Sequence, residues 1–216
     1  MFLKRWHTLI AASLLAFVAA PAGAQTDSDS TRHRDDCRLA TQILTPGIPT
    51  PHRSWARGYI SSCPEQGPEI LVRLWESASS DSSEVVYLER ATARLRDARL
   101  YKRLHTMALD RGRSDLVRVG ALLVLAKYVD PHNAMWFSDL RPPTGSISRV
   151  PLITAWSTNG AQVVGAVPLQ SPIAQPVLEL FERISMEPGT ESHPVRFAAA
   201  VLAKRVKADM VAGRAR

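Results

Sequence analysis

The chain has 216 residues, which is room for one domain with a sizeable core or for one domain plus an appendage. Its 27 Lys and Arg residues against 20 Asp and Glu residues give a formal charge of +7. A modest net charge bears on solubility and association and specifies no ligand. A basic chain could bind nucleic acid in principle, but the export signal described next argues against that partner.

The first 24 residues have the layout of a secretory signal peptide. Lys4 and Arg5 precede an apolar run over residues 9–20, and small residues then lead to an expected cleavage after Ala24. The apolar run is shorter than the roughly 20 residues that a membrane-spanning helix needs. We therefore expect a mature protein that is periplasmic or secreted and does not span a membrane once residues 1–24 are removed.

The two cysteines, Cys37 and Cys63, are predicted to form a disulfide. Residues 25–33 are polar and expected to be disordered, whereas 34–44 and 52–63 have the pattern of short helices joined by a Pro/Gly-rich turn. A short connection makes the helices antiparallel, which brings the cysteines together. Because an oxidising compartment favours a disulfide over a metal site, we interpret the pair as a structural staple.

Four further helices are predicted before residue 130, over residues 67–78, 83–95, 97–111 and 114–129. The first three carry one apolar stripe each. The fourth follows Ser114, a good N-cap, and its only charged residues after Leu116 are Arg118 and Lys127. A helix that is apolar on all sides is covered on several sides, so this one should lie in the middle of the array.

Two of the predicted helices have nearly the same sequence. "SDLVRVGALLVLAK" begins at Ser114 and "SHPVRFAAAVLAK" begins at Ser192, 78 residues later. In addition, Trp55, Val86 and Val117 lie 31 residues apart, each near the start of the second helix of a pair. Helix pairs repeated every 20 to 50 residues indicate a solenoid.

The segments VRVGALLVLAK and VRFAAAVLAK resemble the second helix of a HEAT-like repeat of the armadillo/HEAT superfamily. The resemblance implies an all-α fold, an α-solenoid of about four antiparallel HEAT-like helix pairs, with the first pairs in 34–129 and the last in 172–210. The family often has an aspartate six residues before the arginine, where this chain has Gly112 and Thr190. Residues 211–216 are expected to form a disordered tail.

Residues 130–171 interrupt the helical pattern. A loop is followed by two extended runs around Asn159-Gly160, a strong signal for a small β-hairpin inserted before the last helix pair. A lone hairpin is marginal in water, so we expect this one to pack on the helix over 114–129. Long connections in compact domains are usually functional or disordered, and this one is too apolar for a flexible linker.

The sequence predicts no catalytic site. HExxH, GxSxG, a phosphate-binding glycine loop and a zinc-type cluster of cysteine and histidine are all absent, and the histidines are scattered singly. A triad of Ser146, His132 and Asp139 has no supporting spacing. We therefore expect no enzyme, no cofactor and no metal.

Three groups of residues are candidates for binding, each with a plainer alternative. A basic run forms either an anion-binding surface or a solvated helix face: Arg90, Arg94, Arg96, Arg99, Lys102 and Arg103. Aromatic residues of the insertion form either a recognition surface or anchors for a loop: Trp136, Phe137 and Trp156. Arginines of the second helices either line a concave binding face or form buried salt bridges between repeats: Arg57, Arg118 and Arg196.

The leading interpretation is an exported, non-enzymatic HEAT-like repeat scaffold that binds a protein or peptide partner across its concave face. Weak contact with an anionic envelope surface is expected, and nucleic acid is not. The alternative is an envelope enzyme or accessory factor with its site in the insertion at 130–171.

Overall fold

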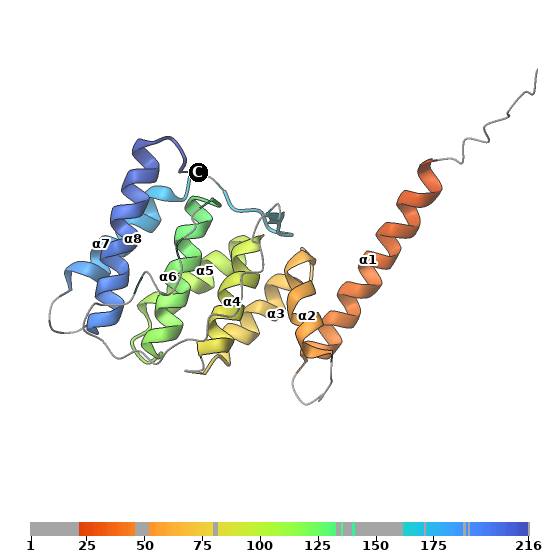
Figure 1. Cartoon of the computed structure of the whole chain (residues 1–216), viewed down its shortest axis with the longest axis horizontal. Coiled ribbons are helices and arrows are strands. Elements are labelled where there is room, and N and C mark those ends of the chain that lie inside the picture. The colour runs from red at the N-terminus through yellow and green to blue at the C-terminus, as the bar shows by residue number, and fades with distance from the viewer. Residues whose placement is uncertain are drawn as a thin grey trace, which may run out of the picture.

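The computed structural model describes residues 22–45, 52–79, 82–132, 135, 140, 162–170, 172–187, 189 and 191–215. These residues are mostly helical, which confirms the all-α prediction. The helices are α1 (Ala22–Leu44), α2 (Arg53–Tyr59), α3 (Gly67–Glu76), α4 (Ser82–Arg94), α5 (Ala98–Leu109), α6 (Asp115–Val129), α7 (Ala174–Met186) and α8 (His193–Val211) (Figure 1). A 3₁₀ turn, η1 (Ile60–Ser62), follows α2, and two short strands are β1 (Leu95–Arg96) and β2 (Val163–Val164).

The helices contact one another in a regular order. Consecutive helices pack together as α1 with α2, α3 with α4, α5 with α6 and α7 with α8. The even-numbered helices also meet in sequence, α2 with α4, α4 with α6 and α6 with α8, and among the odd-numbered helices α1 meets α3 and α3 meets α5. Figure 1 shows these helices following one another along the long axis of the molecule. One hydrophobic core runs through all of them.

Helix α6 is the central helix that the sequence predicts. Every residue from Val117 to Val129 is buried, and α6 contacts α4, α5, α7 and α8. The Ser114 hydroxyl accepts a hydrogen bond from the Val117 N–H at 3.4 Å, as expected for an N-cap. Burial on all sides therefore follows from neighbours on four sides, since an amphipathic helix would expose one face.

The predicted disulfide joins α1 to the residue that follows η1. Cys37 and Cys63 are bonded, with Cα atoms 5.6 Å apart, and both are buried. Helix α1 differs from the expectation of disorder at 25–33, because it begins at Ala22. Residues 29–35 of this extension are exposed. Since adding a turn to an existing helix needs no new nucleus, the packed half of α1 around Cys37 is enough to propagate it. The proposed cleavage after Ala24 stays a prediction.

Helix α8 ends in a glycine motif where the sequence analysis expected a disordered tail. Gly213 has a φ of 68°, the left-handed conformation that favours glycine. The Gly213 N–H donates to the Met210 carbonyl at 3.1 Å and the Arg214 N–H to the Asp209 carbonyl at 2.9 Å. These two bonds are the Schellman motif, which satisfies the last helical carbonyls and orders the chain as far as residue 215.

The insertion is described only in part. The Asn159-Gly160 turn lies outside the described residues, and so does the first extended run of the expected hairpin. The second run includes β2, which pairs in parallel with β1, with Leu95 opposite Val163 and Arg96 opposite Val164. Four apolar residues of the insertion join or contact the core: Met135, Leu140, Val163 and Leu169. None of the helices within the described ranges is long and apolar enough to cross a membrane.

Candidate functional site

The structure places the three predicted arginines on three different even-numbered helices and in different surroundings. Arg57 lies on α2, Arg118 on α6 and Arg196 on α8. Arg118 is buried, whereas Arg57 and Arg196 are half-buried. The aromatic candidates Trp136, Phe137 and Trp156 lie outside the described residues.

Arg118 forms a buried salt bridge, the plainer of its two alternatives. Its Nη1 and Nη2 donate to the two carboxylate oxygens of Glu191 at 2.5 and 2.6 Å, and both side chains are 3% exposed. Its Nε and Nη2 also donate to the Ala108 carbonyl at 3.1 and 2.9 Å. The guanidinium thus joins α6 to the end of α5 and to the residue before the N-cap of α8. A two-pronged pair of this kind fixes geometry as well as charge.

Glu191 is held ionised by its partners. Burial acts to raise the pKa of Glu191, but hydrogen bonds from Arg118 and from the Ser192 N–H outweigh it and lower the pKa below the usual range. The Ser192 hydroxyl in turn donates to Asp115 at 2.8 Å, a second link between α6 and the start of α8. Side-chain contacts between α6 and the start of α8 are therefore present, although positions 112 and 190 hold Gly112 and Thr190 in place of aspartate. The residue that could have indicated them is Glu191, one position after Thr190, where a HEAT-like repeat would have aspartate.

Arg57 is a cation with an aromatic neighbour and no acidic one among the interactions described. Its guanidinium carbon lies 5.1 Å from the centre of the Tyr87 ring, and the Tyr87 hydroxyl donates to the Arg57 carbonyl. Burial raises the pKa of Tyr87, so this hydroxyl stays protonated. The Nε atom of Arg57 is buried and has no hydrogen-bond acceptor among the residues that the structure describes. Arg57 and Tyr87 therefore place a positive charge at the boundary of α2 and α4.

Arg94 adds a second cation to the same side of α4. It lies seven residues after Tyr87, which is two helical turns along one face. Its Nε is also buried, and no described residue supplies it with an acceptor. We call Arg57, Tyr87 and Arg94 the even-helix arginine face. Half-buried guanidinium groups with no carboxylate among the described residues are suited to receive one from another molecule, because charge-assisted hydrogen bonds are stronger than neutral ones.

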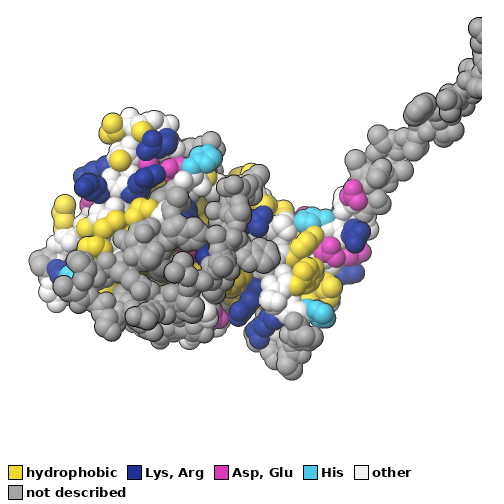
Figure 2. Space-filling model, in the orientation of Figure 1, with side chains coloured by type: hydrophobic (Ala, Val, Ile, Leu, Met, Phe, Trp, Pro, Cys, Tyr) yellow, Lys and Arg dark blue, Asp and Glu magenta, His cyan; other side chains and the backbone are white. Residues whose placement is uncertain are grey.

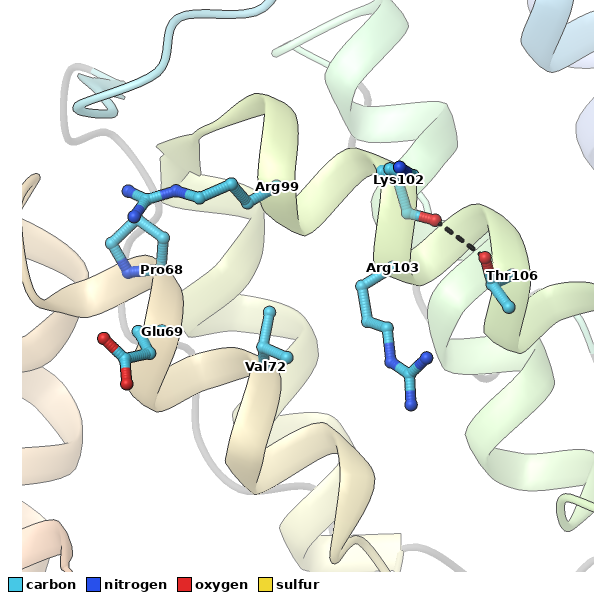
Figure 3. Close-up of a pocket in the computed structure, with 7 residues that line it drawn as sticks. All are labelled: Pro68, Glu69, Val72, Arg99, Lys102, Arg103 and Thr106. Atoms are coloured by element: carbon cyan, nitrogen blue, oxygen red, sulfur yellow. Dashed lines mark hydrogen bonds between the residues drawn. The ribbon is translucent and has the colours of Figure 1, made fainter.

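The basic run also borders a groove of about 520 Å³ between α3 and α5, on the odd-numbered helices. Figure 3 shows Pro68, Glu69 and Val72 of α3 on one side and the basic residues of α5 on the other. The groove is lined by Pro68, Glu69, Val72, Arg99, Lys102, Arg103 and Thr106. Two of its three cations are paired, since Arg103 bonds Glu76 at 2.8 Å and Arg99 bonds Asp97 at 2.9 Å. The groove is therefore close to neutral and fits the solvated-face interpretation of the basic run.

Asp97 fastens the insertion to the corner between α4 and α5. Its fully buried carboxylate caps α5 by accepting the Arg99 N–H at 2.8 Å, and it accepts the Val167 N–H at 3.1 Å. Burial acts to raise the pKa of Asp97, but bonds from Arg99 and Val167 lower it overall. A Cβ atom on Gly165 would lie 2.5 Å from Asp97, so only glycine fits there. The sequence analysis missed this junction.

Two other groups of buried charged residues form ion pairs that join parts of the fold. Lys127 of α6 bonds Glu89 of α4 at 2.6 Å. Asp209 of α8 accepts bonds from Arg205 at 3.1 Å and from Arg214 at 2.8 Å, which holds the chain end against α8. In the described ranges no group of three or more His, Cys, Asp or Glu residues could hold a metal ion.

Comparison with known proteins gives no relative: the chain matches no family model, no curated protein and no solved structure. The residues and their geometry are therefore the whole basis for a functional proposal.

Proposed function

We propose that this chain is an exported HEAT-like α-solenoid that binds a protein or peptide partner carrying acidic residues. The helix pairs are α1–α2, α3–α4, α5–α6 and α7–α8. The observation that carries the proposal is the order of the helix contacts, in which each even-numbered helix meets the next even-numbered one and, in the other layer, α1 meets α3 and α3 meets α5. Stacked helix pairs produce this order, because each repeat contacts its neighbours alone.

The contacts between pairs support the same arrangement. Arg118 of α6 pairs with Glu191 at the start of the next second helix, and Ser192 bonds Asp115 across the same boundary. The near-duplicate sequence of α6 and α8 is explained if both are second helices of repeats. The burial of α6 is explained if a pair lies on each side of it.

The partner surface in this proposal is the even-helix arginine face. Solenoids commonly bind along the extended face formed by one layer of helices. Among the described residues, Arg57 and Arg94 are cations whose buried Nε atoms have no acceptor, and Tyr87 supplies an aromatic surface next to Arg57. Arg, Tyr and Trp dominate the binding energy of protein interfaces, so this composition favours a protein or peptide ligand. Acidic side chains of the partner would supply carboxylate acceptors to Arg57 and Arg94.

Export is the second part of the proposal. It is supported by the predicted signal peptide and by the Cys37–Cys63 disulfide, since disulfides persist in oxidising compartments. Periplasmic and extracellular locations fit equally.

The test is co-purification with the mature chain, residues 25–216, as bait in an extract of the cell envelope. We expect a stoichiometric protein partner that is retained by the wild type and lost with Arg57→Gln. The matched control is Arg73→Gln on α3, because Arg73 is exposed and its only described pairing is with exposed Glu69 at 3.9 Å. Equal retention by both variants would remove the arginine face from the proposal. Turnover of a small molecule or glycan without a stoichiometric partner would contradict the scaffold itself.

A further inference from the structure

Helices α6 and α8 start in the same way. The N-cap Ser114 has φ −61° and ψ 148°, and the N-cap Ser192 has φ −64° and ψ 146°. The third residue of each helix is a buried valine, and the fourth is an arginine, Arg118 in α6 and Arg196 in α8. Residues 78 positions apart are therefore structural counterparts. The groups that surround Arg118 indicate which kind of group the Arg196 guanidinium can bind.

The two arginines differ in what they contact. Arg118 is paired with the Glu191 carboxylate and also donates to the Ala108 carbonyl. Arg196 forms no ion pair with any described residue, and its Nε is buried without an acceptor. Among the described residues, the same guanidinium position thus has a carboxylate partner in α6 and none in α8.

The helix surfaces beside the two arginines differ in burial: the surface in α6 is covered and its counterpart in α8 is more exposed. In α6 the residues at 119, 122, 123 and 126 are all buried: Val119, Leu122, Leu123 and Ala126. Their counterparts in α8 are half-buried or exposed: Phe197, Ala200, Val201 and Lys204. We call these four residues together with Arg196 the α8 end face. Figure 2 shows Lys and Arg side chains gathered near the C-terminal end of α8.

We propose that the α8 end face docks a protein partner that presents a glutamate or aspartate just ahead of a helix, as Glu191 is presented to Arg118. The inference rests on the stacked arrangement of the proposed function. The carboxylate would bond the Arg196 guanidinium, and the apolar side of the partner helix would cover Phe197 and Val201. Lys204, which replaces the buried Ala126, adds positive charge and favours an acidic partner.

The occupant is a different protein rather than the first helix pair of a second copy. Helix α2 has His52 at its N-cap, and the residue before it is Pro51. Glu191 occupies the corresponding position before the N-cap of α8. A second copy stacking its α1–α2 pair on α8 would therefore bring no carboxylate to Arg196.

The experiment uses two synthetic peptides as probes of the full mature chain. One covers residues 189–204, GTESHPVRFAAAVLAK, because this segment is the one that presents a glutamate to an arginine in the structure. The other has Gln in place of Glu191. Fluorescence anisotropy with the wild-type protein should give a Kd at least about tenfold lower for the Glu peptide, since a charge-assisted hydrogen bond is lost in the other.

Variants assign that preference to Arg196. In Arg196→Gln the two peptides should bind equally, and in Arg196→Lys the preference should be partial, because lysine keeps the charge without the planar fork. The control Arg183→Gln, an exposed residue of α7, should keep the wild-type preference. Equal or undetectable binding of both peptides to wild type overturns the proposal, as does a Glu preference that persists in Arg196→Gln. Such a result leaves the proposed function standing if co-purification still depends on Arg57.

Discussion

Replacing Glu191 by glutamine should destabilise the fold strongly, because it removes one partner of a buried pair. Arg118 and Glu191 are both 3% exposed, so the guanidinium left behind can recruit little water. Removing one member of such a pair costs about 3–5 kcal/mol of unfolding free energy. Part of the guanidinium stays satisfied by the Ala108 carbonyl, which places the expected loss at the lower end, about 3 kcal/mol.

The assay is urea unfolding of the oxidised mature protein, followed by circular dichroism at pH 7. The matched control is Glu187→Gln, because Glu187 also pairs with an arginine, Arg111, but their side chains are 37% and 51% exposed. Exposed pairs contribute about 0–1 kcal/mol, so the control should change little. A loss below about 1 kcal/mol in Glu191→Gln, equal to that in the control, would refute the buried bridge as a structural link.

The pH dependence of the same pair has a defined sign. The pKa of Glu191 is lower in the folded state than its ordinary value of 4.5, so the folded state favours the ionised carboxylate. The stability it provides is fully present above the pKa of the unfolded state and is lost as the pH falls through the folded-state pKa. The stability difference between wild type and Glu191→Gln should therefore shrink as the pH drops below 4.5. A difference that stays constant down to acid unfolding would contradict this sign.

Two further predictions concern the disulfide and the insertion. Mass spectrometry of the non-reduced protein should find no free thiol at Cys37 or Cys63, and reduction should lower stability by about 3–4 kcal/mol while the helical signal at low urea remains. Two free thiols in the native protein would refute the bridge. Gly165→Ala should cost about 1–3 kcal/mol because its Cβ would overlap Asp97, whereas Gly58→Ala in α2, with no atom within 4 Å of its Cβ, should be neutral or slightly stabilising. Similar effects of the two substitutions would show that the contact with Asp97 is not tight.

Local patterns predicted the helices because each one depends on its own periodicity and caps. The burial of α6 followed from the absence of a polar face between Leu116 and Val129, and the disulfide followed from export and a short connection. The pairing of β1 with β2 could not be predicted in this way, since Leu95 and Val163 are brought together by tertiary contacts at Asp97 and Gly165.

The sequence predicted which arginines belong to the candidate sites but not which of them are paired. Patterns in the sequence selected Arg57, Arg118 and Arg196, but they could not tell a paired arginine from an unpaired one, because the partner Glu191 is distant in sequence from Arg118. The Schellman ending of α8 had a visible signal in Gly213, which favours the left-handed conformation after a helix.

Hydrogen exchange of the mature protein, alone and with the protein that co-purifies with it, tests the central claim most directly. If the even-helix arginine face binds the partner, the partner slows exchange in α2 and α4, around Arg57, Tyr87 and Arg94. Slower exchange confined to α3 and α5, around the groove of Figure 3, would contradict it, and so would a partner that changes no exchange rate in α2 or α4.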